Sequence, residues 1–472
     1  MTGSNVWRLR GRPWRAMLIS LAPFRLALLS LAVLAASSTT QAFAAPMGPS
    51  MGGAHEGVAS CADSMCHGRQ VASGLVVRQN ELITWQDPAS AAGDHSRAWR
   101  VLTEPRAQAI ANRLGLGPAQ NAATCLGCHA DPAATGRGER FQISDGVGCE
   151  ACHGGSSGWL ASHYAVGADH AANVARGMIP LEDPKVRASV CLNCHFGSAA
   201  PGQFVTHQIM SAGHPRISFE LDLFSTLQRH YDLNANYAKR KPIPSGVKVW
   251  AVGQSMALER ALTLYSDTRH GQEGVFPEFY FFDCHSCHRA IFDDPKARPT
   301  AVANPGRPVP SGTPPFNDEN MIMLSAAART ASPGLAASFE ANSRAFHAAL
   351  ATDRGASIRA AAQLAGSARA LEQAFEGRSF SRGETVAILS QVVGDAQSAR
   401  YTDYTGSAQA VMAIDTLLNA LVAQGQVESS AAAAIRPDIN RAYRAVRDPN
   451  AYHPAEFRES IQRIASAVRS LR

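Results

Sequence analysis

The chain has 472 residues, with ten cysteines, sixteen histidines and a formal net charge of +6. Five of its arginines lie within the first 25 residues, and without them the charge is +1. A chain this close to neutrality has no electrostatic signature of nucleic-acid binding, so we expect no nucleic-acid partner.

Residues 1–44 have the pattern of a secretory signal peptide. Five arginines and no acidic residue accompany an apolar run over residues 26–36, and Ala42-Phe43-Ala44 supplies small residues for cleavage. We expect cleavage after Ala44 and a periplasmic or otherwise exported protein. An uncleaved anchor is the alternative, because residues 16–24 could lengthen the apolar core. No later stretch is expected to span a membrane, although peripheral membrane association is compatible with the sequence.

All ten cysteines fall into five pairs, and a histidine directly follows each pair. Four pairs have the spacing C-x-x-C-H, and the first has four residues between its cysteines. C-x-x-C-H is the attachment signature of haem c: the thiols bond to the two vinyl groups, and the adjacent histidine becomes the proximal ligand of the iron. The five motifs are Cys61, Cys66 and His67; Cys125, Cys128 and His129; Cys149, Cys152 and His153; Cys191, Cys194 and His195; and Cys284, Cys287 and His288.

Disulfides, zinc and thiol redox chemistry are the alternative roles for paired cysteines. A thioredoxin-like site has one motif rather than five, and zinc ribbons do not require a histidine after each second cysteine. No cysteine remains for another role. We therefore predict five covalently attached haem c groups, whose propionates make the loaded protein acidic.

Residues 45–298 contain every cysteine and fourteen of the histidines, and we predict that they form a multihaem cytochrome c domain. Roughly 50 residues for each haem are too few to build an apolar core around it. The porphyrins must supply much of the core, with little regular structure around them. Neighbouring haems must then touch or nearly touch, which makes a path for electrons.

The remainder of the chain has a different composition. Six prolines within 299–316 mark a linker, and residues 317–472 contain no cysteine and no tryptophan but abundant alanine. Ser332-Pro333 and a capping box from Ser381 to Glu384 mark helix starts. We predict an all-α bundle of five or six helices, so that the chain as a whole is mainly α.

The role of this bundle is open between a docking or covering domain and an addition that only stabilises the protein. Few covalent constraints cross the proline-rich segment. We therefore expect that a chain ending near Ala303 would still carry five haems.

Haems that transfer electrons usually have a second strong axial ligand. Of the eleven other histidines, His347 and His453 lie in the haem-free segment, and His285 points away from its own iron. Met210 is at helical spacing and is more often a packing residue. We predict distal ligands at His55, His95, His163, His207 and His214, with His170, His230 and His270 as reserves. A solvated or hydrogen-bonded histidine is the alternative for each.

The stretch from about residue 54 to 298 resembles the multihaem cytochrome c family typified by the tetrahaem cytochrome that accepts electrons from hydroxylamine oxidoreductase. The segments that carry the resemblance are 145–155 with Trp159 and His163, Asp94 to Trp99, and His207 to Glu220. The resemblance implies that these non-motif histidines are distal ligands. The chain departs from that type in its fifth motif, its longer first motif and its C-terminal segment.

The sequence leaves three functions open: an electron carrier, an enzyme and a docking subunit. The first is a carrier, not an enzyme, that passes electrons between redox partner proteins through closely packed bis-histidine haems. The second is an oxidoreductase with one open haem that acts on nitrite, nitric oxide, hydroxylamine or tetrathionate. The third is a docking subunit of a larger complex. The carrier is favoured because the pool of histidines suffices to fill both axial positions of all five irons.

Overall fold

The computed structural model describes residues 52–72, 77–133, 135–271, 278–284, 307–310, 313–398 and 404–471. The predicted signal peptide, with residues Cys287, His285 and His288 of the fifth motif, lies outside these ranges. The described residues are mainly helical, which confirms the predicted class. They contain no named strand, and two isolated bridges pair His55 with Arg137 and Phe282 with Phe316.

The segment that carries the first four haem motifs is built from short helices and long connections, as expected. Its α-helices are α1 (Glu81–Gln86), α2 (Pro105–Arg113), α3 (Ala123–His129), α4 (Cys149–His153), α5 (Leu160–His163), α6 (His170–Val174), α7 (Pro184–His195), α8 (His207–Ser211), α9 (Leu221–Leu227) and α10 (Ala235–Arg240). Single 3-10 turns lie between and beyond them at Val58–Ser60, Ala91–Gly93, His95–Arg97, Arg100–Thr103, Ala119–Asn121, Ile143–Asp145, Ser156–Gly158, Phe279–Phe281 and Pro449–Ala451.

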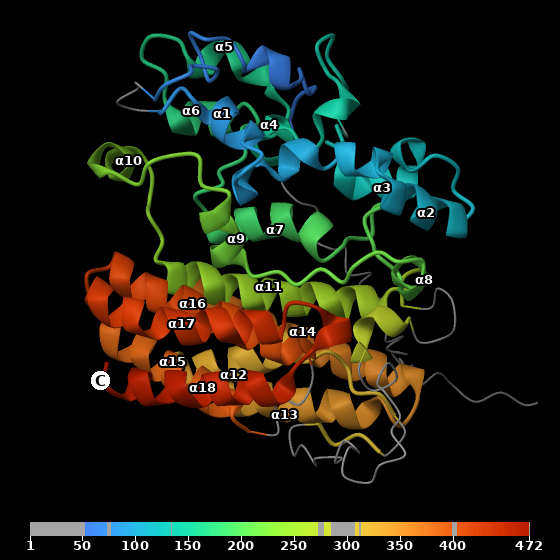
Figure 1. The fold of residues 1–472 in the computed structure, drawn as a ribbon, viewed down its shortest axis with the longest axis vertical. Coiled ribbons are helices and arrows are strands. Elements are labelled where there is room, and N and C mark those ends of the chain that lie inside the picture. The colour runs from blue at the N-terminus through green and yellow to red at the C-terminus, as the bar shows by residue number, and fades with distance from the viewer. Residues whose placement is uncertain are drawn as a thin grey trace, which may run out of the picture. The chain divides into compact units, whose positions relative to one another are not determined.

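Long helices make up the rest of the described chain and lie side by side (Figure 1). They are α11 (Gly246–Ser266), α12 (Glu319–Ala331), α13 (Pro333–Ala349), α14 (Arg354–Glu376), α15 (Arg382–Ala396), α16 (Tyr404–Ala423), α17 (Ser429–Ala445) and α18 (Pro454–Arg469). The described residues after 316 thus hold seven helices, where five or six were expected. The capping box that begins α15 at Ser381 is present as predicted.

Three of the haem motifs occupy the C-terminal end of a helix. Helices α3, α4 and α7 end at the motif histidines His129, His153 and His195. Gly154 follows α4 with a φ of 82°, a left-handed conformation that glycine adopts without strain and that ends the helix there. A short helix followed by a sharp turn places both cysteines and the histidine of one motif on neighbouring turns.

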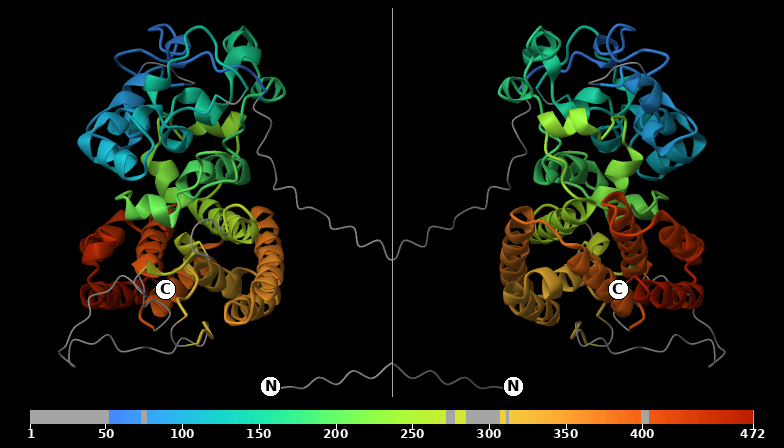
Figure 2. Two further views of the ribbon diagram at one scale, coloured as in Figure 1. Left: turned by 90° about the vertical axis from the view of Figure 1, so that its right-hand side faces the viewer. Right: turned by 90° about the vertical axis from the view of Figure 1, so that its left-hand side faces the viewer.

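Helix α11 precedes the last haem motif in the sequence but packs as a member of the long-helix bundle. Its side chains Trp250, Leu258 and Leu262 are almost completely buried, in one hydrophobic core with residues from α12 to α18. Both side views show α11, in yellow-green, between the short green helices and the bundle (Figure 2). Among the described residues, α11 and the helices after residue 316 therefore share one hydrophobic core. The reason is that α11 has apolar side chains on every face. The predicted boundary at residue 298 lies outside the described ranges.

Polar contacts also join the haem segment to the bundle. Lys185 of α7 pairs with Glu372 at 3.1 Å and with Glu376 at 3.3 Å, both on α14. Arg260 of α11 donates to the carbonyl of Gly197, just beyond α7, at 2.7 Å. Because these contacts come from several helices, the haem segment rests on a broad support rather than on a single linker.

Helix α16 is long and apolar enough to cross a membrane by length and composition alone, which we did not expect from the sequence. However, 83% of its most apolar window is buried inside the protein. In the described structure it is therefore the central core helix of the bundle.

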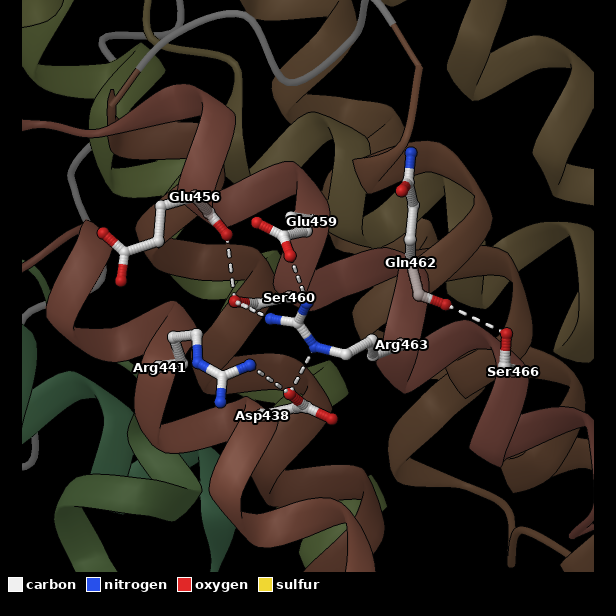
Figure 3. A network of polar contacts seen from close by, with 8 residues as sticks. All are labelled: Asp438, Arg441, Glu456, Glu459, Ser460, Gln462, Arg463 and Ser466. Atoms are coloured by element: carbon white, nitrogen blue, oxygen red, sulfur yellow. Dashed lines mark hydrogen bonds and ion pairs between the residues drawn. The ribbon is translucent and has the colours of Figure 1, made fainter.

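A network of ion pairs joins α17 to α18 on the outside of the bundle (Figure 3). Asp438 of α17 accepts from Arg441 at 2.9 Å and from Arg463 of α18 at 2.7 Å, and Arg463 also pairs with Glu459 at 2.6 Å. Exposed pairs of this kind contribute little individually, up to about 1 kcal/mol each. The apolar contacts beneath them are the main stabilisation of this helix pair.

Candidate haem centres

Four motif histidines each lie opposite a second histidine ring that comes from a distant part of the chain. The ring centres are 6.0 to 6.3 Å apart in all four pairs. The ring planes are nearly parallel in the first pair, at 11°, and are inclined by 69° to 85° in the other three. The pairs are His67 with His163, His129 with His214, His153 with His230, and His195 with His95.

A metal ion held between two imidazole nitrogens accounts for this separation. A metal–nitrogen bond of roughly 2 Å on each side, with about 1.1 Å from each nitrogen to its ring centre, adds to about 6.2 Å. The four pairs have this spacing although they come from different helices and differ in the angle between their rings. The common spacing is the one expected for two histidines that would bind one metal ion from opposite sides.

Hydrogen bonds turn the Nε2 atoms of several rings toward the opposite ring. A carbonyl or carboxylate oxygen can only accept, so a ring bonded to one through Nδ1 must carry its proton there. Its Nε2 atom then keeps the lone pair that binds a metal. The carboxylate of Glu81 accepts from His67 at 3.0 Å. Backbone carbonyls accept from the other four rings: Ala98 from His129 at 2.8 Å, Leu160 from His163 at 2.5 Å, Pro215 from His214 at 2.8 Å, and Gln228 from His230 at 2.9 Å.

Burial keeps two of the motif histidines neutral. Loss of solvent lowers the pKa of His153 to about 3 and the pKa of His195 to about 4. Burial likewise raises the pKa of the Cys152 thiol to about 12 and that of Cys191 to about 11. Neutral imidazole is the form that binds a metal ion, so these rings are prepared for that role without a proton to lose.

These residues fit haem c. Each of the first four motifs provides two cysteines without a disulfide partner and a histidine opposite a second histidine. Bound haem would supply a one-electron couple between ferric and ferrous iron. The chain's own residues would hold the porphyrin by its edge, fix both axial ligands and keep water away from them.

The motifs meet in an order that differs from their order in the sequence. The thiol of Cys61 in the first motif is a close neighbour of Cys149 in the third. Cys152 of the third motif is a neighbour of Cys194 of the fourth, and Cys194 is a close neighbour of Cys128 of the second. The first four motifs therefore form a row in the order first, third, fourth, second.

The fifth motif adjoins the second-motif end of this row. Its Cys284 is a neighbour of Arg216, which lies two residues beyond His214, the histidine opposite His129. The guanidinium of Arg216 also lies over the ring of Tyr280, 5.0 Å from its centre. The residues that accompany Cys284, namely Cys287 and His288, lie outside the described ranges.

Three of the five histidines that we predicted as distal ligands belong to the ring pairs, namely His95, His163 and His214. The fourth pair uses His230, which we had placed among the reserves. His230 lies three residues beyond the end of α9 and meets a motif from a distant part of the chain. No periodicity or motif in the sequence indicates that meeting, so the fold was needed to find it.

We also predicted His55 as a distal ligand, because it lies just before the first motif. Its ring lies opposite none of the described motif histidines. Its ring is completely buried, and its Nδ1 atom bonds to Asp131 at 2.9 Å. Its backbone pairs with Gly136 and Gly138 on either side of Arg137. The Asp131 contact and this bridge hold the N-terminal segment in place, while the buried Nε2 atom of His55 has no hydrogen-bond partner among the described residues. His55 stays a ligand predicted from the sequence, and His230 joins the candidates by its position opposite His153.

The other predicted and reserve histidines have separate contacts. The ring of His207, at the start of α8, lies edge-on to Phe279 with 5.5 Å between the ring centres. His170 bonds to Glu182 at 2.5 Å, and His270 bonds to Asp267 at 2.9 Å. Each of His170 and His270 thus bonds to a carboxylate, and neither belongs to the four described ring pairs.

The longer first motif is accommodated by a compact turn. The backbone N–H of Cys66 donates to the carbonyl of Asp63 at 2.9 Å, and that of His67 donates to the carbonyl of Cys61 at 3.2 Å. The two additional residues are taken up within the turn. His67 therefore still lies next to its cysteines and opposite His163.

Comparison with known proteins supports the same class. Residues 60–154, which contain the first three motifs, match the family model described as cytochrome c554 and c-prime. No curated protein and no solved structure matched the chain. The match supports a multihaem c-type cytochrome that binds haem c covalently and takes part in electron transfer.

Proposed function

We propose that the protein is an exported, periplasmic five-haem cytochrome that carries electrons between redox partner proteins. The four histidine pairs are the observation that carries this proposal, because an iron with two histidine ligands has no free position for a substrate. Such an iron changes its oxidation state with little rearrangement of its ligands. Electrons would then pass along the row of motifs rather than react with a small molecule.

The row of motifs supports a continuous path. Cysteines of the first and third motifs are close neighbours, as are cysteines of the second and fourth. Because each cysteine marks the edge of one porphyrin, these haems would lie edge to edge or closer. The path would run from the first haem through the third, fourth and second to the fifth.

We assign His207 as the distal ligand of the fifth haem, with His288 as its proximal ligand. The segment that follows Phe279, against which the His207 ring packs, leads directly to Cys284. The carboxylate of Glu278 in the same segment accepts the backbone N–H of His207 at 2.7 Å. These contacts hold the start of α8 beside the fifth motif.

An oxidoreductase with one open haem is the second candidate. In each of the first four motifs, the paired histidine rings would fill both axial positions of the iron. An open iron would therefore have to be the fifth, with His207 serving as a proton donor or acceptor near a bound nitrogen or sulfur compound. This version differs from the carrier in a single feature, the spin state of one haem.

Low-temperature electron paramagnetic resonance of the oxidised protein tests these alternatives. We expect only low-spin ferric signals. The near-parallel rings of His67 and His163 should give one rhombic signal, and the three inclined pairs should give signals with much larger anisotropy. One stoichiometric high-spin haem, with steady turnover of nitrite, hydroxylamine or tetrathionate by reduced protein, would replace the carrier by the enzyme.

A further inference from the structure

His67 differs from two of the other motif histidines, His129 and His195, in the acceptor at its Nδ1 atom. Its Nδ1 atom donates to the carboxylate of Glu81 at 3.0 Å, whereas His129 donates to a neutral backbone carbonyl. The Nδ1 atom of His195 is buried and has no hydrogen-bond partner among the described residues. The Nδ1 proton is therefore drawn toward its acceptor most strongly in His67, less in His129, and not at all in His195.

The carboxylate of Glu81 is held in position by its surroundings. It is the first residue of α1, where the helix dipole favours a negative charge. Its second oxygen accepts the backbone N–H of Gln79 at 3.1 Å, and the backbone N–H of Leu82 donates to the carbonyl of His67 at 3.1 Å. Its side chain is only 15% exposed, so little water competes for the hydrogen bond.

A carboxylate acceptor makes a ligand histidine a stronger electron donor. The Nδ1 proton is drawn toward the oxygen, the ring becomes more basic, and its Nε2 atom gives more electron density to a metal. Ferric iron gains more from this than ferrous iron does, so the reduction potential of that haem falls.

The surroundings of His195 act in the opposite direction. Its ring stacks on Phe219 at 4.8 Å and meets Phe224 at 5.4 Å, with an angle of 73° to that second ring. Without an acceptor at Nδ1 the imidazole stays a weaker donor. An apolar shell also disfavours the more highly charged ferric state, so both effects raise the potential of the fourth haem.

We propose that Glu81 is a positioning residue that acts through His67 and makes the first haem the lowest in potential of the four with described ligand pairs. The fourth haem, held by His195, is then the highest of the four. The inference rests on the proposed electron-transfer function. It adds a direction: an electron delivered to the first haem moves downhill through the third haem to the fourth.

A redox titration of the whole haem-loaded protein, followed by electron paramagnetic resonance, tests this proposal. The first haem is identified by its rhombic signal, which is set by the 11° angle between its ligand planes. In the wild-type protein this signal should be the last of the four to disappear on reduction. In Glu81→Gln, the amide keeps an acceptor oxygen but loses the charge. The midpoint potential of the first haem in this variant should rise by about 59 mV, which is a tenfold shift in a one-electron reduction equilibrium.

Glu182→Gln is the matched control. It removes another largely buried carboxylate that bonds to a histidine, His170, which lies opposite none of the described motif rings. We expect Glu182→Gln to shift the midpoint potential of the rhombic signal by only a small fraction of the shift in Glu81→Gln. An equal shift in both variants would mean that long-range charge, and not the His67 hydrogen bond, sets the potential.

The remaining outcomes separate this inference from the function on which it rests. An unchanged midpoint in fully loaded Glu81→Gln, or a rhombic signal that is reduced early in the wild-type protein, overturns the role of Glu81 and leaves the carrier intact. If the wild-type protein lacked the rhombic signal and carried fewer than five haems, the first haem would be shown to be absent. The haem content of every variant is therefore measured by its pyridine haemochrome.

Discussion

The hydroxyl group of Thr416 donates a hydrogen bond of 2.6 Å to the carboxyl group of Glu220, 196 residues earlier in the chain. Glu220 caps the first turn of α9, directly after Phe219, whose ring stacks on His195. Thr416 lies on α16, in the centre of the bundle. A single buried contact thus links the fourth haem centre to the core of the C-terminal helices.

Removal of the C-terminal helices should prevent normal folding of the haem segment, contrary to what we expected from the sequence. A chain ending near Ala303 would expose Trp250, Leu258 and Leu262 of α11, each of which contributes about 1.5–3 kcal/mol or more when buried. With the other side chains of α11, this loss exceeds the net stability of a typical domain, about 5–15 kcal/mol. We expect degradation or incomplete haem loading on expression, measured by haem stain and mass spectrometry.

A second, longer truncation serves as its comparison. A chain that ends after α16 keeps the contacts of α11 with α12, α14 and α16, and loses only α17 and α18. It should retain more haem than the chain ending near Ala303. Full loading of the shorter chain would show that the haem segment folds without the bundle.

The stability of the protein should fall as the pH rises through the neutral range because of Glu220. Burial, together with the nearby charge of Asp222, raises the pKa of Glu220 to about 8. The folded protein therefore keeps a proton that the unfolded chain releases above its ordinary pKa of about 4.3. The stabilising contribution is complete below that value and is lost as the pH increases toward 8.

Glu220→Gln isolates this effect, because the amide cannot ionise. At pH 5 the variant and the wild-type protein should unfold at similar denaturant concentrations, whereas at pH 9 the variant should be the more stable. Each unit of raised pKa corresponds to about 1.4 kcal/mol, so the difference should be measurable by circular dichroism. Thr416→Val removes the hydroxyl donor and should steepen the pH dependence. Parallel pH profiles of wild type and Glu220→Gln would contradict the assignment.

The mature protein should carry five haems, one for each motif. A pyridine haemochrome assay with mass spectrometry of the intact chain counts them directly. Replacement of both Cys61 and Cys66 by serine should lower the count to four, because the turn between them places His67 opposite His163 as in the other motifs. A wild-type count of four would identify the longer first motif as one that is not loaded.

His230→Ala should convert one low-spin haem to high spin, because it removes the ring opposite His153. His55→Ala should destabilise the N-terminal segment without creating a high-spin haem, since its described contact is to Asp131. His270→Ala, at another buried histidine bonded to a carboxylate, controls for general disturbance. A high-spin signal in His55→Ala and none in His230→Ala would support the ligand set that we expected from the sequence.

The motif cysteines and their histidines could be predicted from the sequence because covalent attachment requires them to be neighbours in the chain. Distal ligands have no such constraint. His163 follows its neighbouring motif closely and could be proposed, but His230 meets His153 only after the chain has folded around the porphyrins. The contact of His55 with Asp131 likewise depends on two segments that are distant in sequence.

The division of the chain was harder to predict for a related reason. Cysteine content suggested that everything before residue 298 belongs to the haem segment, but α11 has no haem ligand and an apolar surface on all sides. Its packing partners, α12, α14 and α16, all lie after the proline-rich segment. Composition marks where haem is attached, whereas the hydrophobic core follows the apolar side chains.

The close approach of thiols from different motifs bears on how the protein must mature. In the folded chain the thiol of Cys61 is a close neighbour of Cys149, and the thiol of Cys128 is a close neighbour of Cys194. In an oxidising compartment, neighbouring thiols of this kind are consumed by disulfide formation. We therefore expect haem to be attached to the extended polypeptide before its motifs come together, with folding as the later step.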